Sequence, residues 1–347
     1  MALVTANASD LNWADVSEGQ PIAGFALPIT AKTLVLAVMG TRDVMPYHHN
    51  QAFCHRLGIR DAFVNTAYLQ ALLSRCATDW SGPRAVLTSM SLNMKDQLCL
   101  GDVARVHGSV VRTWAEEDKR KAEIDIKVAT DQGREVAGAR MVLNLVADDV
   151  APVPQIMSVS PPSVELDSEM PEAMRTRLDE RVVRHAPFPV SEAQIGYWCD
   201  MVRDAHPAYQ RTDGSGAHVI APAASMSIWN LSRAGQLGVT ASAPDIDVPD
   251  QRAWPNAVDS DWPFEWRAPG AREVIVQRRH AEFGAVVRPG DLIRSTAQLL
   301  NCSSRRRTKL GDGYFVSRYE VYQNQNDEVI GSTTMSLFQY GIGDGDE

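Results

Sequence analysis

The pattern of apolar and polar positions divides the first half of the chain into helical stretches followed by strands. Residues 31–40 form an apolar run that Thr30 can cap, and residues 67–76 form a second apolar helical run. Strand-like stretches separated by polar turns come next, at 84–92, 102–114, 122–130 and 135–146. Helices followed by consecutive strands predict an α+β fold with antiparallel pairing, not alternating α/β units.

The same order of motifs appears twice along the chain. Three blocks of the first half have counterparts in the second half, which predicts two related units. The pairs are RDVMPYH (42–48) with RDAHPAY (203–209), LGDVARVHGSVV (100–111) with PGDLIRSTAQLL (289–300), and REVAGARMVLNLV (134–146) with DEVIGSTTMSLFQ (327–339). In the second half, Ser191 and Gln194 fit a capping box ahead of apolar residues at helical spacing.

These repeats define the expected domain boundaries. We expect a first unit over 20–146, a linker over 147–184 that is rich in proline and acidic residues, and a second unit over 185–340. The second unit is longer because it contains an insert at 241–270, rich in proline and tryptophan. So much aromatic surface favours an ordered insert or lid over a disordered one.

Composition narrows the class of protein. The 347 residues carry a net charge of −9 and are 44% hydrophobic, which predicts a well-packed globular protein and argues against nucleic acid as a partner. The five cysteines lie far apart without a C-x-x-C pair, which favours reduced thiols over a disulfide framework or a zinc site. With neither a signal-like N-terminus nor a long apolar run, we expect a cytoplasmic protein without a membrane span.

The stretch RDVMPYHH (42–49) contains the first candidate chemistry. Asp43 and His48 would lie about 140° apart on a continuous helix, but Pro46 ends the helix and allows His48 to swing back. A carboxylate and an imidazole that meet can hold a water molecule and move its proton, as addition of water to a polarised double bond requires. His49 is expected to point elsewhere and is not included in this pair.

A second candidate feature is the start of the apolar helix within 63–76. A cap is expected at Asn65 or Thr66, and the first helical N–H groups lack acceptors within the helix. A buried helix start of this kind can bind a thioester oxyanion. The backbone N–H of Thr66 is therefore the candidate donor.

These motifs resemble the (R)-specific enoyl-CoA hydratases of the MaoC-like hot-dog family, whose motif reads D-x-N-P-L-H and is followed by an H-G-M-type entry to the central helix. Asp43, Pro46 and His48 match in spacing, whereas Met45 replaces the motif asparagine and residues 65–66 replace the His-Gly pair.

The second unit resembles a degenerate copy of the same motif. It keeps Asp204 and Pro207 but has Tyr209 at the position of the base. Double hot-dog hydratases commonly place the active half last, whereas here it comes first.

The resemblance implies two hot-dog domains, each an antiparallel sheet wrapped around a central helix, with an acyl-CoA thioester entering between them. Asp43 and His48 would bind the water, and the Thr66 N–H would donate to the thioester carbonyl. The implied reaction is hydration of a trans-2-enoyl-CoA to a (3R)-3-hydroxyacyl-CoA, or the reverse, without metal or redox cofactor. The motifs also resemble family branches acting on bulky, steroid-side-chain-like acyl groups, and a homodimer is expected because exposed sheet surface favours a partner.

Two other functions stay open. A hot-dog thioesterase would use a carboxylate and a water molecule without needing His48, and an acyl-CoA-binding or assembly protein would keep the motif as scaffold.

The turn at 303–316 concentrates Arg305, Arg306, Arg307 and Lys309, which suit either CoA phosphates or simple exposure to solvent.

Overall fold

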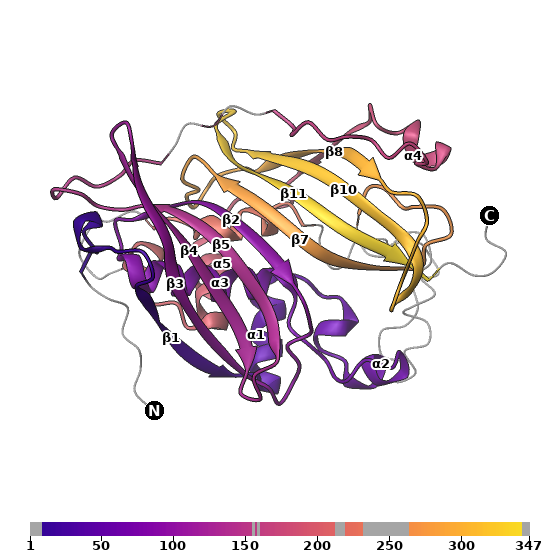
Figure 1. Ribbon diagram of the computed structural model, residues 1–347, viewed down its shortest axis with the longest axis horizontal. Coiled ribbons are helices and arrows are strands. Elements are labelled where there is room, and N and C mark those ends of the chain that lie inside the picture. Colours follow the sequence, from indigo (N-terminus) through magenta and orange to yellow (C-terminus); the bar gives the residue numbers. More distant parts are fainter. Residues whose placement is uncertain (1–8, 155–156, 158–159, 212–218, 232–263, 342–347) are drawn as a thin grey trace.

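One antiparallel sheet of eleven strands forms the body of the molecule, and its main helices lie against one face (Figure 1). The structure is a computed structural model, and it describes residues 9–154, 157, 160–211, 219–231 and 264–341. Long stretches with alternating burial produce this architecture, because each strand needs one face covered.

The first half contributes five strands and the longest helix. The short helix η1 (Trp13–Asp15) precedes them, and the other helices of this half lie between its first and second strands. The strands are β1 (Pro21–Pro28), β2 (Val86–Met94), β3 (Val103–Glu116), β4 (Lys119–Thr130) and β5 (Glu135–Asn144), and the helices are α1 (Ala31–Thr41), η2 (Pro46–His48), α2 (Gln51–Arg56) and α3 (Thr66–Ser81). In the sheet their order is β1-β3-β4-β5-β2, with antiparallel neighbours throughout.

The second half repeats this arrangement. Its strands are β6 (Arg181–His185), β7 (Glu273–Phe283), β8 (Arg294–Cys302), β9 (Arg306–Thr308), β10 (Gly311–Gln323) and β11 (Val329–Tyr340), and its helices are α5 (Glu192–Val202), η3 (Pro207–Tyr209) and η4 (Ala223–Ile228). The order β6-β8-β10-β11-β7 matches that of the first half, with β9 as an added strand on β10. The internal repeat therefore extends to topology.

The two halves join edge to edge. Strand β2 pairs with β7 from Ser89 opposite Glu282 to Asn93 opposite Arg278. The two expected sheets are thus continuous, and both central edges are hidden from solvent.

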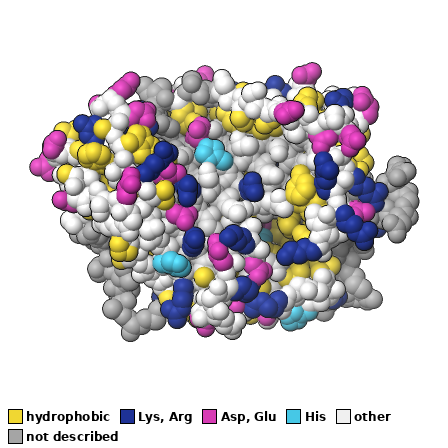
Figure 2. All heavy atoms as spheres, viewed as in Figure 1, with side chains coloured by type: hydrophobic (Ala, Val, Ile, Leu, Met, Phe, Trp, Pro, Cys, Tyr) yellow, Lys and Arg dark blue, Asp and Glu magenta, His cyan; other side chains and the backbone are white. Residues whose placement is uncertain are grey.

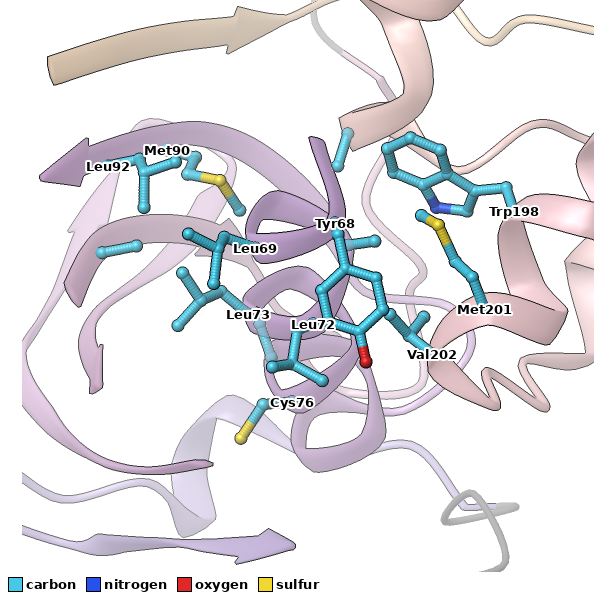
Figure 3. Packing of buried hydrophobic residues seen from close by; sticks show 14 of the residues in the cluster. Tyr68, Leu69, Leu72, Leu73, Cys76, Met90, Leu92, Trp198, Met201 and Val202 are labelled. Carbon is cyan, nitrogen blue, oxygen red and sulfur yellow. The ribbon is translucent and has the colours of Figure 1, made fainter. Parts of the chain in front are cut away.

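Helix α3 is the central helix of the first half. Tyr68, Leu69, Leu72, Leu73 and Cys76 project from it, toward Met90 and Leu92 of the sheet on one side and Trp198, Met201 and Val202 of α5 on the other (Figure 3). Twelve of its sixteen residues are buried, so apolar packing on nearly all sides fixes its position. Between η3 and β7, the described part of the second half contains the 3₁₀ helix η4.

Capping residues set the helix starts. The Thr30 side chain caps α1, as predicted, and Ser191 caps α5 by accepting from the Gln194 N–H at 3.2 Å. The capping box expected there is only half formed. The Gln194 side chain instead donates to the Met39 and Gly40 carbonyls at 3.0 and 2.9 Å, because the C-terminal end of α1 offers unpaired acceptors close by.

The segment expected to be a linker, 147–184, contains the short helix α4 (Glu172–Arg175) and the start of β6. Met170 and Met174 from this segment pack into the second hydrophobic core with Trp266.

Of the insert at 241–270, residues 241–263 lie outside the described residues. Among the described residues, no helix is long and apolar enough to cross a membrane. Figure 2 shows acidic and basic side chains interspersed on the face seen in Figure 1.

Candidate active site

The end of α1 positions Asp43. Arg42 adopts a left-handed conformation with φ of 59°, which ends the helix and turns the chain. The Asp43 N–H then donates to the Thr41 hydroxyl at 3.3 Å, and the Asp43 Oδ1 accepts from the Met45 N–H at 3.3 Å. These local bonds orient the carboxylate, as is typical of an Asx turn.

Pro46 starts the short helix η2, which carries His48 back toward Asp43. The His48 Nε2 lies 3.3 Å from the Asp43 Oδ2, and His48 is buried. On its other side, the His48 Nδ1 lies 2.8 Å from the Phe63 carbonyl oxygen. A carbonyl only accepts, so the Nδ1 carries a hydrogen, and the Nε2 becomes the basic atom whenever the ring is neutral.

Opposing effects set the charges of this pair. Burial favours the neutral forms, but the charge of His48 and its hydrogen bond lower the pKa of Asp43 below its usual value. In turn, the Asp43 carboxylate and the Phe63 carbonyl raise the pKa of His48, although burial alone would lower it. Asp43 is therefore ionised at neutral pH, and His48 is a stronger base than a free imidazole.

Helix α3 begins three residues after Phe63, whose carbonyl oxygen accepts from His48. Asn65 is the cap, and its Oδ1 accepts from the Tyr68 N–H at 2.8 Å. That bond leaves the Thr66 and Ala67 N–H groups, in the first turn, without an acceptor inside the helix. The sequence left Asn65 and Thr66 open as caps, and the structure assigns the cap to Asn65, with Thr66 as the first helical residue.

Two positioning contacts were not identified from the sequence. The Thr41 hydroxyl donates to the Ala37 carbonyl at 2.6 Å and accepts from the Asn65 side chain at 2.6 Å, so it ties the end of α1 to the start of α3. The Tyr47 hydroxyl donates to the Glu273 Oε2 at 2.8 Å, which links η2 to β7 of the second half. The position of Thr41 directly before the Arg-Asp pair was an available signal, but nothing local marks Glu273.

The second copy of the motif has the same backbone and other side chains. Asp204 is buried and accepts from the His206 N–H at 3.0 Å, as Asp43 does from Met45. Tyr209 stands where His48 stands in the first copy, and its ring stacks on His206 with centroids 4.2 Å apart. Burial raises the pKa of Asp204 to about 6 and lowers that of His206 to about 4.

Other candidate residues lie apart from the Asp43–His48 pair. His49 is exposed, and its Nε2 lies 3.1 Å from the Val44 carbonyl. In the basic turn, Arg305 pairs with Asp312 at 3.3 Å and Arg306 pairs with Asp167 at 3.5 Å. These carboxylates neutralise part of the basic charge expected for phosphates. Among the described residues, no three His, Cys, Asp or Glu side chains gather in a way that could hold a metal ion.

Comparison with solved structures identifies the architecture as a double hot-dog fold. A conserved hypothetical protein of Mycobacterium tuberculosis, described as having a double hotdog fold, matches with a TM-score of 0.62 at 13% identity over 95% of this chain and 99% of that one. A putative MaoC domain protein dehydratase from Chloroflexus aurantiacus matches with a TM-score of 0.64 at 11% identity, over 97% and 100% of the two chains. The chain therefore has the double hot-dog fold found among MaoC-like dehydratases.

Curated proteins add a similarity in sequence. A probable enoyl-CoA hydratase alpha subunit of Thermomonospora curvata is 24% identical over 161 residues, which are 45% of this chain and 47% of that protein. The 3-oxo-4,17-pregnadiene-20-carboxyl-CoA hydratase beta subunit of Mycobacterium tuberculosis is 34% identical over 61 residues, which are 18% and 47% of the two. The chain spans about half the length of the curated relatives it matches. No family model matches it.

Proposed function

We propose that this protein hydrates a trans-2-enoyl-CoA to a (3R)-3-hydroxyacyl-CoA, or catalyses the reverse dehydration. The observation that carries the proposal is the pair formed by the buried His48 Nε2 and the half-buried Asp43 Oδ2 at 3.3 Å, close in the chain to the uncapped N–H groups of α3. An acid, a base and an oxyanion donor are the groups that addition of water to an enoyl thioester requires.

In the proposed reaction, a water molecule is held beside the Asp43–His48 pair and hydrogen-bonds to both side chains. The His48 Nε2 takes one proton while the water oxygen bonds to C3 of the enoyl group, and the electrons of the C2–C3 double bond move toward the thioester oxygen. The Thr66 N–H, at the positive end of the α3 dipole, donates to that oxygen. A proton from the Asp43–His48 pair then goes to C2, which completes the addition of one water molecule.

The relatives support both the reaction and a bulky substrate. The printed names of the two curated relatives are enoyl-CoA and pregnadiene-carboxyl-CoA hydratase subunits. We propose a bulky acyl group here because the second of these names a steroid thioester. The (3R) configuration remains part of the proposal.

The test is an assay of the purified full chain with trans-2-enoyl-CoA thioesters from short-chain to steroid-sized. Products are resolved by mass and by the configuration of the new hydroxyl, in parallel with Asp43→Asn and His48→Ala. We expect a (3R)-hydroxyacyl-CoA that both substitutions abolish. Release of free CoA that survives His48→Ala would replace the proposal with a thioesterase, and binding without turnover would replace it with an acyl-CoA-binding protein.

We also propose that the protein is a homodimer. The sheet ends in two edge strands, β1 and β6, and unpaired strand edges favour pairing with another chain. Light scattering after gel filtration is expected to give twice the chain mass of 38.1 kDa. A monomeric mass across the accessible concentration range would contradict this expectation.

A further inference from the structure

The second half of the sheet contains an unusual set of buried charges on the face that turns toward the helices. Arg318 and Glu320 of β10 and Arg279 of β7 are each no more than 6% exposed. Arg184 of β6 and Glu265 complete the set, which we call the buried charge cluster. The Arg184 side chain is 35% exposed, so it lies at the edge of the cluster, and two buried guanidinium groups face two buried carboxylates in a region where charges are costly unless paired.

Both carboxylates of the buried charge cluster are already engaged. The Arg318 Nη2 donates to the Glu265 Oε1 at 3.1 Å and to the Glu320 Oε2 at 2.6 Å. The Arg184 Nη2 lies 3.2 Å from the same Glu265 oxygen. Glu320 also accepts from the hydroxyls of Ser295 and Tyr322 at 2.5 and 2.8 Å. Arg318 therefore contacts both carboxylates, and Arg184 contacts that of Glu265, whose Oε2 is buried without a hydrogen-bond partner in the described part of the chain.

Arg279 is the cation that this network leaves over. Its Nη1 donates to the Gln70 Oε1 at 3.0 Å, and that partner is a neutral amide. The Nε is buried without a hydrogen-bond partner, and within the described residues no carboxylate lies within 4.0 Å of this guanidinium. Burial lowers the pKa of Arg279, while Tyr322 and Glu320 act on it from a distance in the opposite direction. An arginine keeps its proton in proteins, so within the described residues this buried positive charge has no carboxylate in contact with it.

The position of Arg279 relates it to the proposed active site. Across the junction of β2 and β7, Arg279 lies opposite Leu92 of β2. Met94 lies two residues beyond Leu92 on the same face, and its sulfur is 3.4 Å from the Thr66 hydroxyl. Gln70 follows Thr66 by four residues, a rise of about 6 Å along α3. An acyl group whose thioester oxygen rests at the Thr66 N–H and which extends along α3 toward the second half would reach Arg279.

We propose that Arg279, held by Gln70, binds a carboxylate on the acyl group of the substrate, so that the substrate is the CoA thioester of an unsaturated dicarboxylic acid. This inference rests on the proposed hydratase function. A carboxylate would place a negative charge in contact with Arg279 and supply the missing acceptor for its Nε. Gln70 fixes the guanidinium from its other edge, so little side-chain entropy would be lost on binding.

The first experiment compares substrates on the unmodified full chain. Matched series of trans-2-enoyl-CoA esters of increasing length carry a terminal methyl, a terminal ketone or a terminal carboxylate. We expect one length of the carboxylate series to exceed its methyl counterpart in kcat/KM by about ten- to hundredfold, as charge-assisted hydrogen bonds give. Hydration of the methyl or ketone esters as fast as the carboxylate esters would overturn the inference and leave the hydratase proposal standing.

The second experiment substitutes Arg279 and a matched control on the same strand. Arg279→Gln removes the charge toward the helices, whereas Arg278→Gln removes one from the exposed neighbour on the opposite face. We expect Arg279→Gln to lose the preference for carboxylate esters while keeping turnover of methyl esters, Arg279→Lys to retain part of it, and Arg278→Gln to match the wild type. An equal loss on all esters would show a structural role only and overturn the inference.

A binding measurement separates failure of the inference from failure of the proposed reaction. Calorimetric titration uses the CoA thioesters of a saturated dicarboxylic acid and of the matching monocarboxylic acid, neither of which can be hydrated. Tighter binding of the dicarboxylic thioester, abolished in Arg279→Gln but not in Arg278→Gln, supports the carboxylate site even if no enoyl ester reacts. Equal affinity for both thioesters in the wild type refutes the site, whatever the enzyme assay shows.

Discussion

The two copies of the Arg-Asp motif share one backbone and differ in chemistry. In both, an arginine in the left-handed conformation ends a helix, with φ of 59° at Arg42 and 57° at Arg203. In both, the following aspartate accepts the N–H two residues further on, and a proline then starts a 3₁₀ helix. The local backbone that brings the last residue of each motif, His48 or Tyr209, back toward the aspartate is thus preserved in both halves.

The difference lies in what faces each carboxylate. Asp43 faces the imidazole of His48, and its pKa is lowered, whereas no imidazole among the described residues pairs with the Asp204 carboxylate, and burial raises its pKa to about 6. His206 does not replace His48, since its Nδ1 accepts from the Ala208 N–H at 3.2 Å and its pKa falls to about 4. The same turn therefore holds an ion pair in one half and two groups that favour their neutral forms in the other.

Replacing the last residue of each motif, His48 or Tyr209, is the strongest way to break this comparison. We expect His48→Ala to lower kcat for enoyl-CoA hydration by about 10²- to 10⁴-fold, because the general base is lost. Tyr209→Phe, which keeps the partly buried ring, is expected to leave kcat within about twofold. Steady-state kinetics on folded variants, verified by thermal melting, measure both.

Similar losses in His48→Ala and Tyr209→Phe would show that the second copy takes part in the reaction. The assignment of catalysis to the first half alone would then be wrong.

Asp204 offers the next largest effect, on stability. Its pKa is raised from 3.8 to about 6 in the folded protein, so the folded state binds the proton more tightly than the unfolded chain does. Stability is therefore lost as pH rises from about 4 to about 6, by about 3 kcal/mol at most. The lowered pKa of His206 contributes a change of opposite sign over the same range, so the Asp204 contribution is expected as the difference between the wild-type and Asp204→Asn profiles in urea unfolding between pH 4 and pH 7.

Asp200→Asn on the exposed face of α5 is the control for that measurement and is expected to retain the wild-type pH profile. A profile of Asp204→Asn that coincides with that of the wild type would mean that Asp204 contributes nothing to the pH dependence.

The packing of α1 on α5 tests how closely the two copies depend on each other. A methyl group added at Gly40 would lie 2.7 Å from the Tyr197 carbonyl oxygen and 2.8 Å from the Met201 sulfur. We expect Gly40→Ala to destabilise the protein by about 1–3 kcal/mol, because the helices must separate. Gly196→Ala, where nothing lies within 4 Å of the added carbon, is expected to stabilise α5 by up to about 1 kcal/mol. Opposite signs in denaturant unfolding would establish the close crossing, and equal signs would refute it.

Features encoded by neighbouring residues could be predicted from the sequence. The caps at Thr30 and Ser191 and the succession of helices and strands follow from local hydrogen bonding and periodicity. The repeated blocks predicted two related units, and the structure shows the same strand order in both. The approach of His48 to Asp43 was predicted from a helix break at Pro46, but the break was misplaced: α1 already ends at Arg42, and Pro46 instead starts η2.

Contacts between distant residues could not be predicted in this way. The pairing of β2 with β7 depends on two edges that no local pattern marks as partners. The bond from Tyr47 to Glu273 spans 226 positions, and the bond from Arg279 to Gln70 spans 209. Arg279 follows the exposed Arg278 in sequence, and only the alternation of faces along β7, once its register is known, assigns one to solvent and the other to the interior.

The smallest predicted effect sharpens the comparison through two histidines. NMR titration of the imidazole signals is expected to place His48 above 6.5, its ordinary value, and His206 near 4, because a carboxylate faces the first, whereas burial outweighs the charge of Asp10 at the second. Asp43→Asn removes the carboxylate, so the His48 pKa should fall while that of His206 stays. The base must be neutral to accept a proton, so the acid limb of kcat/KM for hydration is expected above pH 6.5. A His48 pKa that does not change in Asp43→Asn would show that the 3.3 Å pair carries no electrostatic coupling, and the contrast between the two motifs would reduce to shape alone.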